Sequence, residues 1–197
     1  MKRIILLATF LIAISGNLQA QQKMSKEDMQ KVYDAYGMPG DMHKMMAKSA
    51  GTWNAEVTMW GMDPSMAPTK SKGTATVKMV LGGRFQHAQH MGTMNGKPFE
   101  GFSIMGYDNF KKVFQDTWVD NMGTGIMTME GTWDAAGKMI HFKGMGFDPV
   151  SGKDFMVRKE VTFINDNTQK MEMYMTMPGA MEMKSMEVVL KRDMTKK

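Results

Sequence analysis

Methionine gives this sequence most of its chemical character, because a thioether is soft, flexible and oxidisable. The chain holds 28 Met and no Cys. Residues 1–20 carry four Leu and only the initiator Met, whereas residues 21–197 carry just Leu81 and Leu190. A drift in codon usage would have altered both segments. We therefore expect the methionines to serve the folded protein or the conditions that it meets.

The clearest methionine pattern is an alternation near the C-terminus. The alternating residues are Met171, Met173, Met175 and Met177, followed after a Pro-Gly turn by Met181 and Met183. Alternate residues of a strand point to one face, so each run lines one side of a strand. From Met186 onward the apolar residues fall in the opposite register, which predicts a β-bulge near Lys184 and Ser185.

Four roles for these thioethers stay open. Methionine can replace Leu and Ile as core filler, since its volume is similar and its side chain adapts to irregular space. A Met-lined interior would form a soft pocket for apolar ligands. Exposed methionines can absorb oxidants, because sulfoxide formation is reversible. Thioethers also select Cu(I). The alternative copper ligands are the methionines gathered around one turn: Met177, Met181, Met183 and Met186.

The histidines form no evident metal site. His87 and His90 are three residues apart, so on a regular strand they point to opposite faces and cannot grip one ion. We interpret both as polar imidazoles of a surface strand. His43 is expected to cap a short helix or to pack against the mouth of a barrel. His141 stands alone, and no pattern around it supports a haem ligand.

The carboxylates offer no acid–base pair. Asp116, Trp118 and Asp120 share one face of a predicted strand, with Glu130 as a potential neighbour. The two Asp would lie about 13 Å apart, which is too far for direct proton transfer. We therefore interpret them as a solvated face or a rim.

No known catalytic motif occurs, whether a nucleophile elbow, a zinc helix, a phosphate loop or a dinucleotide fingerprint. We assign no catalytic residue, no metal and no cofactor, and we favour a non-catalytic protein. An enzyme of unknown reaction at the barrel mouth stays open as an alternative. It would use Tyr107, Asp116 or Asp120.

Two short helices are expected before the strands begin. Ser25, followed by Glu27 and Asp28, is typical of a helix start. The segment Gly37-Met38-Pro39-Gly40 ends that helix. A second short helix is predicted from Asp41 to Ser49.

From Gly51 onward the sequence is typical of strands. Apolar and polar residues alternate in runs that begin near Trp53, Ala75 and Phe155, which indicates sheets with one buried face and one wet face. Turn signals rich in Gly, Pro, Asn and Asp separate the runs. About ten strands at intervals of roughly 8–15 residues favour an all-β antiparallel barrel. Closure of the barrel would remove exposed sheet edges.

Residues 1–20 are typical of a secretory signal peptide. Lys2 and Arg3 precede an apolar run, and Ala20 offers a small residue at the cleavage site. The run is too short to span a bilayer comfortably. We therefore predict an exported protein, periplasmic or secreted, with no stable membrane anchor after signal cleavage. Without Cys, disulfides and thiolate metal sites are excluded.

The rest of the chain suits one domain. The predicted organisation is a signal peptide at 1–20, a helical segment at 21–50, a β-barrel domain at 51–192 and a C-terminal tail at 193–197. The formal net charge of +5 includes Lys2 and Arg3 and falls to +3 without them. The lysines are scattered, so we expect no nucleic-acid surface. The oligomeric state stays open.

Six motifs follow one another in a familiar order. They are Pro39-Gly40-Asp41-Met42-His43, Ala50-Gly51-Thr52-Trp53, Leu81-Gly82-Gly83-Arg84-Phe85, Pro98-Phe99-Glu100-Gly101, Gly106-Tyr107-Asp108-Asn109 and Trp118-Val119-Asp120-Asn121-Met122-Gly123-Thr124-Gly125. This order resembles the bacterial family called domain of unknown function 1579, many of whose members are secreted. The resemblance covers roughly residues 36–192. It implies a lipocalin-like antiparallel β-barrel, with Trp53 plugging one end, and no established activity. The methionine content departs from the family.

The sequence thus predicts non-covalent binding of a small apolar molecule inside a barrel. This prediction assumes that the apolar faces of the strands point inward. The predicted lining residues are Trp53, Val57, Met59, Val77, Met79, Met171, Met173 and Met175.

Overall fold

Ten antiparallel strands form a closed barrel in the computed structural model, which describes residues 24–63, 65–94 and 96–195. The strands are β1 (Gly51–Met59), β2 (Thr69–Val80), β3 (Phe85–Met94), β4 (Lys97–Asp108), β5 (Val113–Asp120), β6 (Met127–Asp134), β7 (Met139–Asp148), β8 (Lys153–Asn165), β9 (Thr168–Thr176) and β10 (Met183–Arg192). Each strand pairs with the next along the chain, and β10 returns to pair with β1. The predicted barrel is confirmed.

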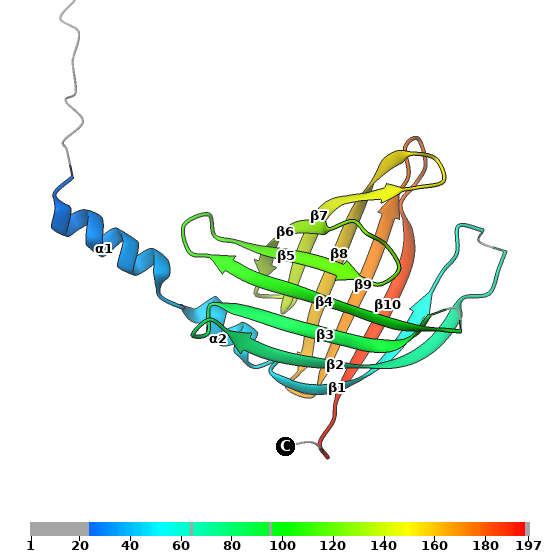
Figure 1. Ribbon diagram of the computed structural model, residues 1–197, viewed down its shortest axis with the longest axis horizontal. Coiled ribbons are helices and arrows are strands. Elements are labelled where there is room, and N and C mark those ends of the chain that lie inside the picture. Colours follow the sequence, from blue (N-terminus) through cyan, green and yellow to red (C-terminus); the bar gives the residue numbers. More distant parts are fainter. Residues whose placement is uncertain (1–23, 64, 95, 196–197) are drawn as a thin grey trace, which may run out of the picture.

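Two helices precede the barrel, α1 (Lys26–Gly37) and α2 (Asp41–Ala47). The Ser25 side chain accepts a hydrogen bond from the Asp28 backbone N–H at 3.0 Å, as expected for a helix start. No residue of α1 is buried, and Figure 1 shows this helix projecting away from the barrel. The Asn109 side chain holds its end by donating to the carbonyls of Tyr36 and Met38.

The predicted signal peptide at residues 1–20 lies outside the described residues. Within the part of the chain that the structure describes, no helix has the length and apolar character needed to cross a membrane.

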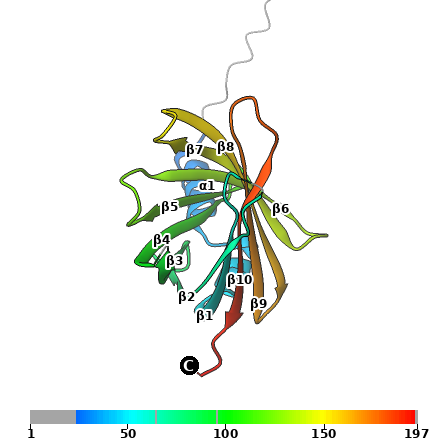
Figure 2. The same ribbon diagram turned by 90° about the vertical axis from the view of Figure 1, so that its right-hand side faces the viewer.

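Helix α2 closes one end of the barrel. In Figure 2, where the right-hand side of Figure 1 faces the viewer, α1 lies behind the strands. Met46 of α2 is fully buried and packs in the main core cluster with Phe114, Ile140 and Phe142. The indole of Trp53 donates to the Ser49 carbonyl at 3.0 Å just after α2, so the Trp is buried at this end. The opposite end of the barrel carries the longer connections, among them those from β1 to β2 and from β9 to β10.

Arg192 completes the closed end. Its guanidinium donates to the carbonyls of Lys48, Ala50 and Asp166 and lies over the Trp53 ring, 4.2 Å from its centroid. One side chain at the end of β10 therefore ties together the segment after α2, the start of β1 and the turn between β8 and β9.

The pairing of β9 with β10 contains the predicted bulge. The register shifts between Lys184 and Met186, so Met183 lies opposite Met175 and Met186 lies opposite Met173. Because of the shift, methionines on both sides of the bulge stay opposite the alternating methionines of β9.

Candidate functional site

The barrel is not filled by its own side chains. It encloses a cavity of about 370 Å³, and all ten strands contribute lining residues. This volume lies within the range of small-molecule sites, roughly 300–1,000 Å³. The interior is therefore the candidate site.

One wall of the cavity is apolar and rich in methionine. It is built by the inward faces of β1, β9 and β10, where alternate residues point to the interior. Its residues are Ala55, Val57, Met59, Met171, Met173, Met186, Val188 and Leu190. Thioethers and branched aliphatic chains give this wall a deformable apolar surface.

Five of the eight residues predicted to line a pocket lie on the cavity: Val57, Met59, Val77, Met171 and Met173. The other three do not. Trp53 is fully buried beneath Arg192 at the closed end. Met79 packs against the core cluster that contains Met46. Met175 lies further along β9, opposite Val157 and Met183.

A buried ion pair crosses the interior. Lys159 on β8 donates to the Asp116 carboxylate on β5, and the two side chains are 13% and 6% exposed. The Lys159 ammonium also lies 4.5 Å from the centroid of the Phe142 ring. Two charges are rarely buried unless they are paired in this way.

The opposite wall carries the polar groups, set among apolar residues such as Met127, Met129 and Phe142. On β5, the Trp118 indole donates to the Asp120 carboxylate at 2.7 Å, and both residues line the cavity. Gly101 on β4 leaves room for that indole: a Cβ at Gly101 would come within 2.6 Å of it. The indole therefore reaches across β4 to His90 on β3, with ring centroids 5.3 Å apart.

His90 is held neutral at pH 7. Burial and, to a smaller extent, the positive charge of Lys159 lower the pKa of its imidazole to about 4, although the negative charge of Asp116 partly opposes them. A neutral imidazole offers one donor nitrogen and one acceptor nitrogen. His90 thus faces the cavity as an uncharged hydrogen-bonding group.

Two amides serve the closed end instead of the cavity space. Gln86 donates to the Met46 carbonyl at 3.0 Å, and Gln169 donates to the Ser49 hydroxyl at 2.8 Å. Both side chains line the cavity, but their donors fasten the segment that follows α2.

The sequence interpretation of the polar strand residues was wrong. Asp116, Trp118 and Asp120 are on an inward face, and His90 lines the cavity and does not belong to a surface. The reason is that buried charges can be paired across the barrel, which alternation alone cannot reveal. A signal was present: Lys159 stands at the inward position between Val157 and Val161.

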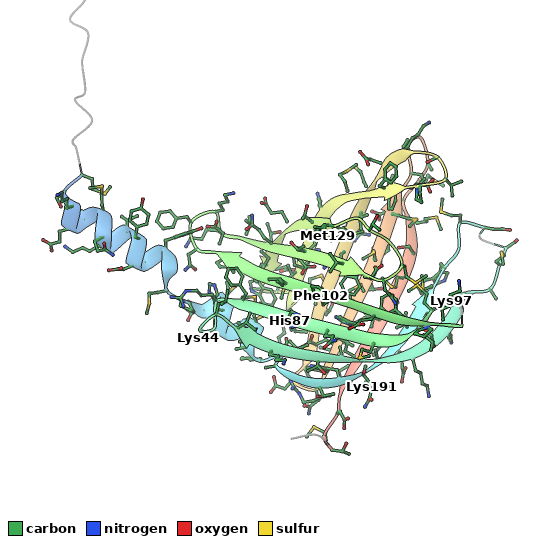
Figure 3. The ribbon with its side chains drawn as sticks, in the orientation of Figure 1. Lys44, His87, Lys97, Phe102, Met129 and Lys191 are labelled. Atoms are coloured by element: carbon green, nitrogen blue, oxygen red, sulfur yellow. The ribbon has the colours of Figure 1, made fainter. Side chains whose placement is uncertain are left out.

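The other histidines lie outside the cavity lining. The prediction that His87 and His90 point to opposite faces is confirmed, because His87 packs against the exposed Phe102 on the outer side of β3 and β4 (Figure 3). His43 caps α2 by accepting from the Gly40 N–H at 3.0 Å and packs against Tyr107. His141 lies 3.3 Å from a Glu160 carboxylate oxygen.

The residues of the alternative enzyme do not gather at one point. Tyr107 packs against His43 and Phe114 beside α2 and is not part of the cavity lining. Asp116 and Asp120 do line the cavity, but Glu130, which the sequence suggested as their neighbour, is exposed opposite Gln115 on the other face of the sheet.

The four methionines of the copper alternative differ in their surroundings. Met186 lines the cavity, Met177 and Met183 are half-buried, and Met181 is 90% exposed in the loop before β10. Among the described residues, His, Asp and Glu form no group of three or more that could hold a metal ion. That observation does not concern thioethers.

Fold and site together define a closed antiparallel β-barrel with an amphipathic interior cavity. The chain belongs to the family described as "Protein of unknown function (DUF1579)", which matches residues 38–192. The resemblance noted in the sequence is therefore confirmed.

Two solved structures that this chain matches share little sequence with it. Rv2717c from M. tuberculosis shares 14% identity with a TM-score of 0.59, over 79% of this chain and 99% of that one. A redesigned β-barrel shares 14% identity with a TM-score of 0.40, over 78% of this chain and 99% of that one. The comparison with curated proteins gave no match. The likeness to Rv2717c concerns the fold alone.

Proposed function

We propose that this protein binds a small, largely apolar molecule inside its barrel. The observation that carries the proposal is the cavity of about 370 Å³, walled on one side by methionine, valine and leucine. Burial of apolar surface contributes about 25 cal/mol per Å², so such a wall favours an apolar ligand. Flexible thioethers adapt to more than one ligand shape, which favours a class of ligands over one compound.

We also propose that binding takes place after export. The support is the signal-like sequence of residues 1–20, with its basic start and short apolar run. Cell fractionation and N-terminal analysis of the host protein test this step. The expected result is an exported chain that begins at Gln21, and a cytoplasmic chain with an intact N-terminus would contradict it.

Native mass spectrometry of protein purified from its host tests the binding proposal directly. The expected result is a retained organic molecule that is released on unfolding. Bound copper would favour the thioether alternative instead. A chain that neither retains a ligand nor takes up any neutral apolar dye would contradict the binding proposal.

A blocking substitution locates the ligand. Met173 lines the cavity and packs against the core cluster, so Met173→Trp fills space with an indole. We expect a loss of dye affinity of at least about tenfold, since the ligand loses its place against the wall. Affinity is measured by fluorescence titration with a neutral dye such as Nile red.

The matched control lies on β8. Met156 is 59% exposed, outside the cavity lining. Met156→Trp adds the same indole to the surface and should leave dye affinity within about twofold. Equal dye affinity of Met173→Trp and the wild type would place the ligand outside the cavity.

A further inference from the structure

The hydrogen bonds around the cavity leave several polar groups unused, and two of them, His90 and Ser103, are neighbours on β3 and β4. Asp116 and Lys159 pair with each other, and the Trp118 indole donates to Asp120. The side chains of His90 and Ser103 have no hydrogen-bond partner among the described residues, although both line the cavity.

These two groups are open to the cavity space. Among the described residues, every side-chain nitrogen or oxygen that is fully enclosed has a hydrogen-bond partner. The unpartnered atoms of His90 and Ser103 are therefore accessible. His90 lies opposite Gly101 in the ladder, and Ser103 is two residues further along the same face of β4. Diagonal neighbours of this kind lie roughly 7–8 Å apart, so one ligand group can reach both.

The charges of the cavity do not suit an anion. Two carboxylates, Asp116 and Asp120, line the interior against the single buried cation Lys159. Lys72 also borders the cavity, but it is exposed. A carboxylate ligand would have to leave water for a site whose one buried cation is already paired, which is costly.

We propose that the ligand is an apolar molecule with one uncharged hydroxyl group, and that this hydroxyl binds His90 and Ser103 while the apolar body lies against the methionine wall. This inference rests on the proposed function. A hydroxyl both donates and accepts, and so do a neutral imidazole and a serine hydroxyl. The site thus matches an alcohol or a phenol better than a fatty acid.

The test is a competition series with compounds of equal chain length. The assay measures displacement of Nile red from the full-length mature protein at neutral pH by decanol, decyl methyl ether, decanoate and decylamine. We expect decanol to bind most tightly, with an advantage of roughly three- to tenfold over the ether, which lacks the donor. Decanoate should bind at least about tenfold more weakly than decanol.

Variants assign that advantage to His90. His90→Phe should abolish the preference for decanol over the ether, and His90→Gln, which keeps a donor and an acceptor, should retain part of it. His87→Phe is the matched control on the outer side of the same strand and should retain all of it. Circular dichroism checks that each variant folds.

Failure of this inference differs from failure of the proposed function. If Nile red binds and Met173→Trp blocks it, but decanoate or decylamine binds as tightly as decanol, only the hydroxyl assignment is overturned. An unchanged preference in His90→Phe overturns it too. If neither the dye nor any compound binds to the wild type, both proposals are wrong.

Discussion

The ion pair of Lys159 and Asp116 is buried, so removal of one partner should greatly lower the stability of the fold. They join β8 to β5 through the interior, with side chains 13% and 6% exposed. Lys159→Met should lower the free energy of unfolding by about 3–5 kcal/mol, because Asp116 is left buried without a partner. The double variant Lys159→Met with Asp116→Leu should restore most of the loss. Urea unfolding measures both.

An exposed ion pair provides the control. Lys191 and Glu56 are 3.0 Å apart with side chains 59% and 58% exposed, so Lys191→Met should cost less than about 1 kcal/mol. A similar small cost for Lys159→Met would show that the buried pair contributes nothing special.

His90 makes the stability depend on pH. Its pKa is about 4 in the folded protein, below the ordinary value of 6.5 for a histidine, with burial as the main cause. The unfolded chain therefore binds the proton first as the pH falls. The contribution of neutral His90 to the free energy of unfolding is fully present above about pH 6.5. It is lost as the pH falls towards 4, by at most about 3 kcal/mol.

Unfolding free energies between pH 4 and pH 7 test this prediction. His90→Gln should flatten the loss, while His87→Gln, on the outer side of β3, should leave it unchanged. The same loss in His90→Gln would assign the pH dependence to other groups.

At the scale of residues, sequence predicts apolar faces better than buried charges. The alternation of Met171 and Met173 correctly implied one shared face, since a strand has period two. Asp116 and Lys159 were not predicted as a pair, because they are 43 residues apart and meet only through the curvature of the closed sheet. Nothing local distinguishes a paired inward Asp from a solvated one.

Strand β10 is the element on which closure of the barrel depends, and Arg192 is its anchor. Arg192→Lys should destabilise the protein by about 1–3 kcal/mol, because an ammonium cannot reach three carbonyls and lie flat over Trp53 at once. Thermal unfolding measures the effect.

Arg84→Lys is the comparison for this exchange. Arg84 is exposed and, among the residues that the structure describes, donates only to the Leu81 carbonyl at 3.2 Å, so the same substitution should stay within about 0.5 kcal/mol. Equal melting temperatures for Arg192→Lys and the wild type would contradict the role of Arg192.

The elements themselves were largely predictable. Gly82 and Gly83, both with positive φ, form the tight turn between β2 and β3, at one of the glycine-rich turn signals of the sequence. The bulge near Ser185 followed from a change of register in the sequence. The sequence did not predict that the face of β5 with Phe114 and Trp118 points inward, because charged residues share that face with them.

Across the whole molecule, methionines occupy both the interior and the surface. Met62, Met66 and Met181 are 59%, 66% and 90% exposed in loops, whereas Met46 and Met105 are 0% and 8% exposed. Under limiting peroxide the three loop methionines should form sulfoxides before the buried ones. Peptide mass mapping over time measures the order.

Dye binding should survive this first phase of oxidation, because the loop methionines lie outside the cavity lining. Affinity should fall only when cavity methionines such as Met171 become polar sulfoxides. Simultaneous oxidation of exposed and buried methionines would mean that the barrel opens faster than peroxide reacts.

The pairing of β1 with β10 joins the first strand of the ring to the last. During synthesis β1 emerges from the ribosome first and β10 last, so this pairing cannot form until the whole domain has been made. A polypeptide truncated before Met183 would leave β1 and β9 as two unpaired edge strands, and such edges promote aggregation.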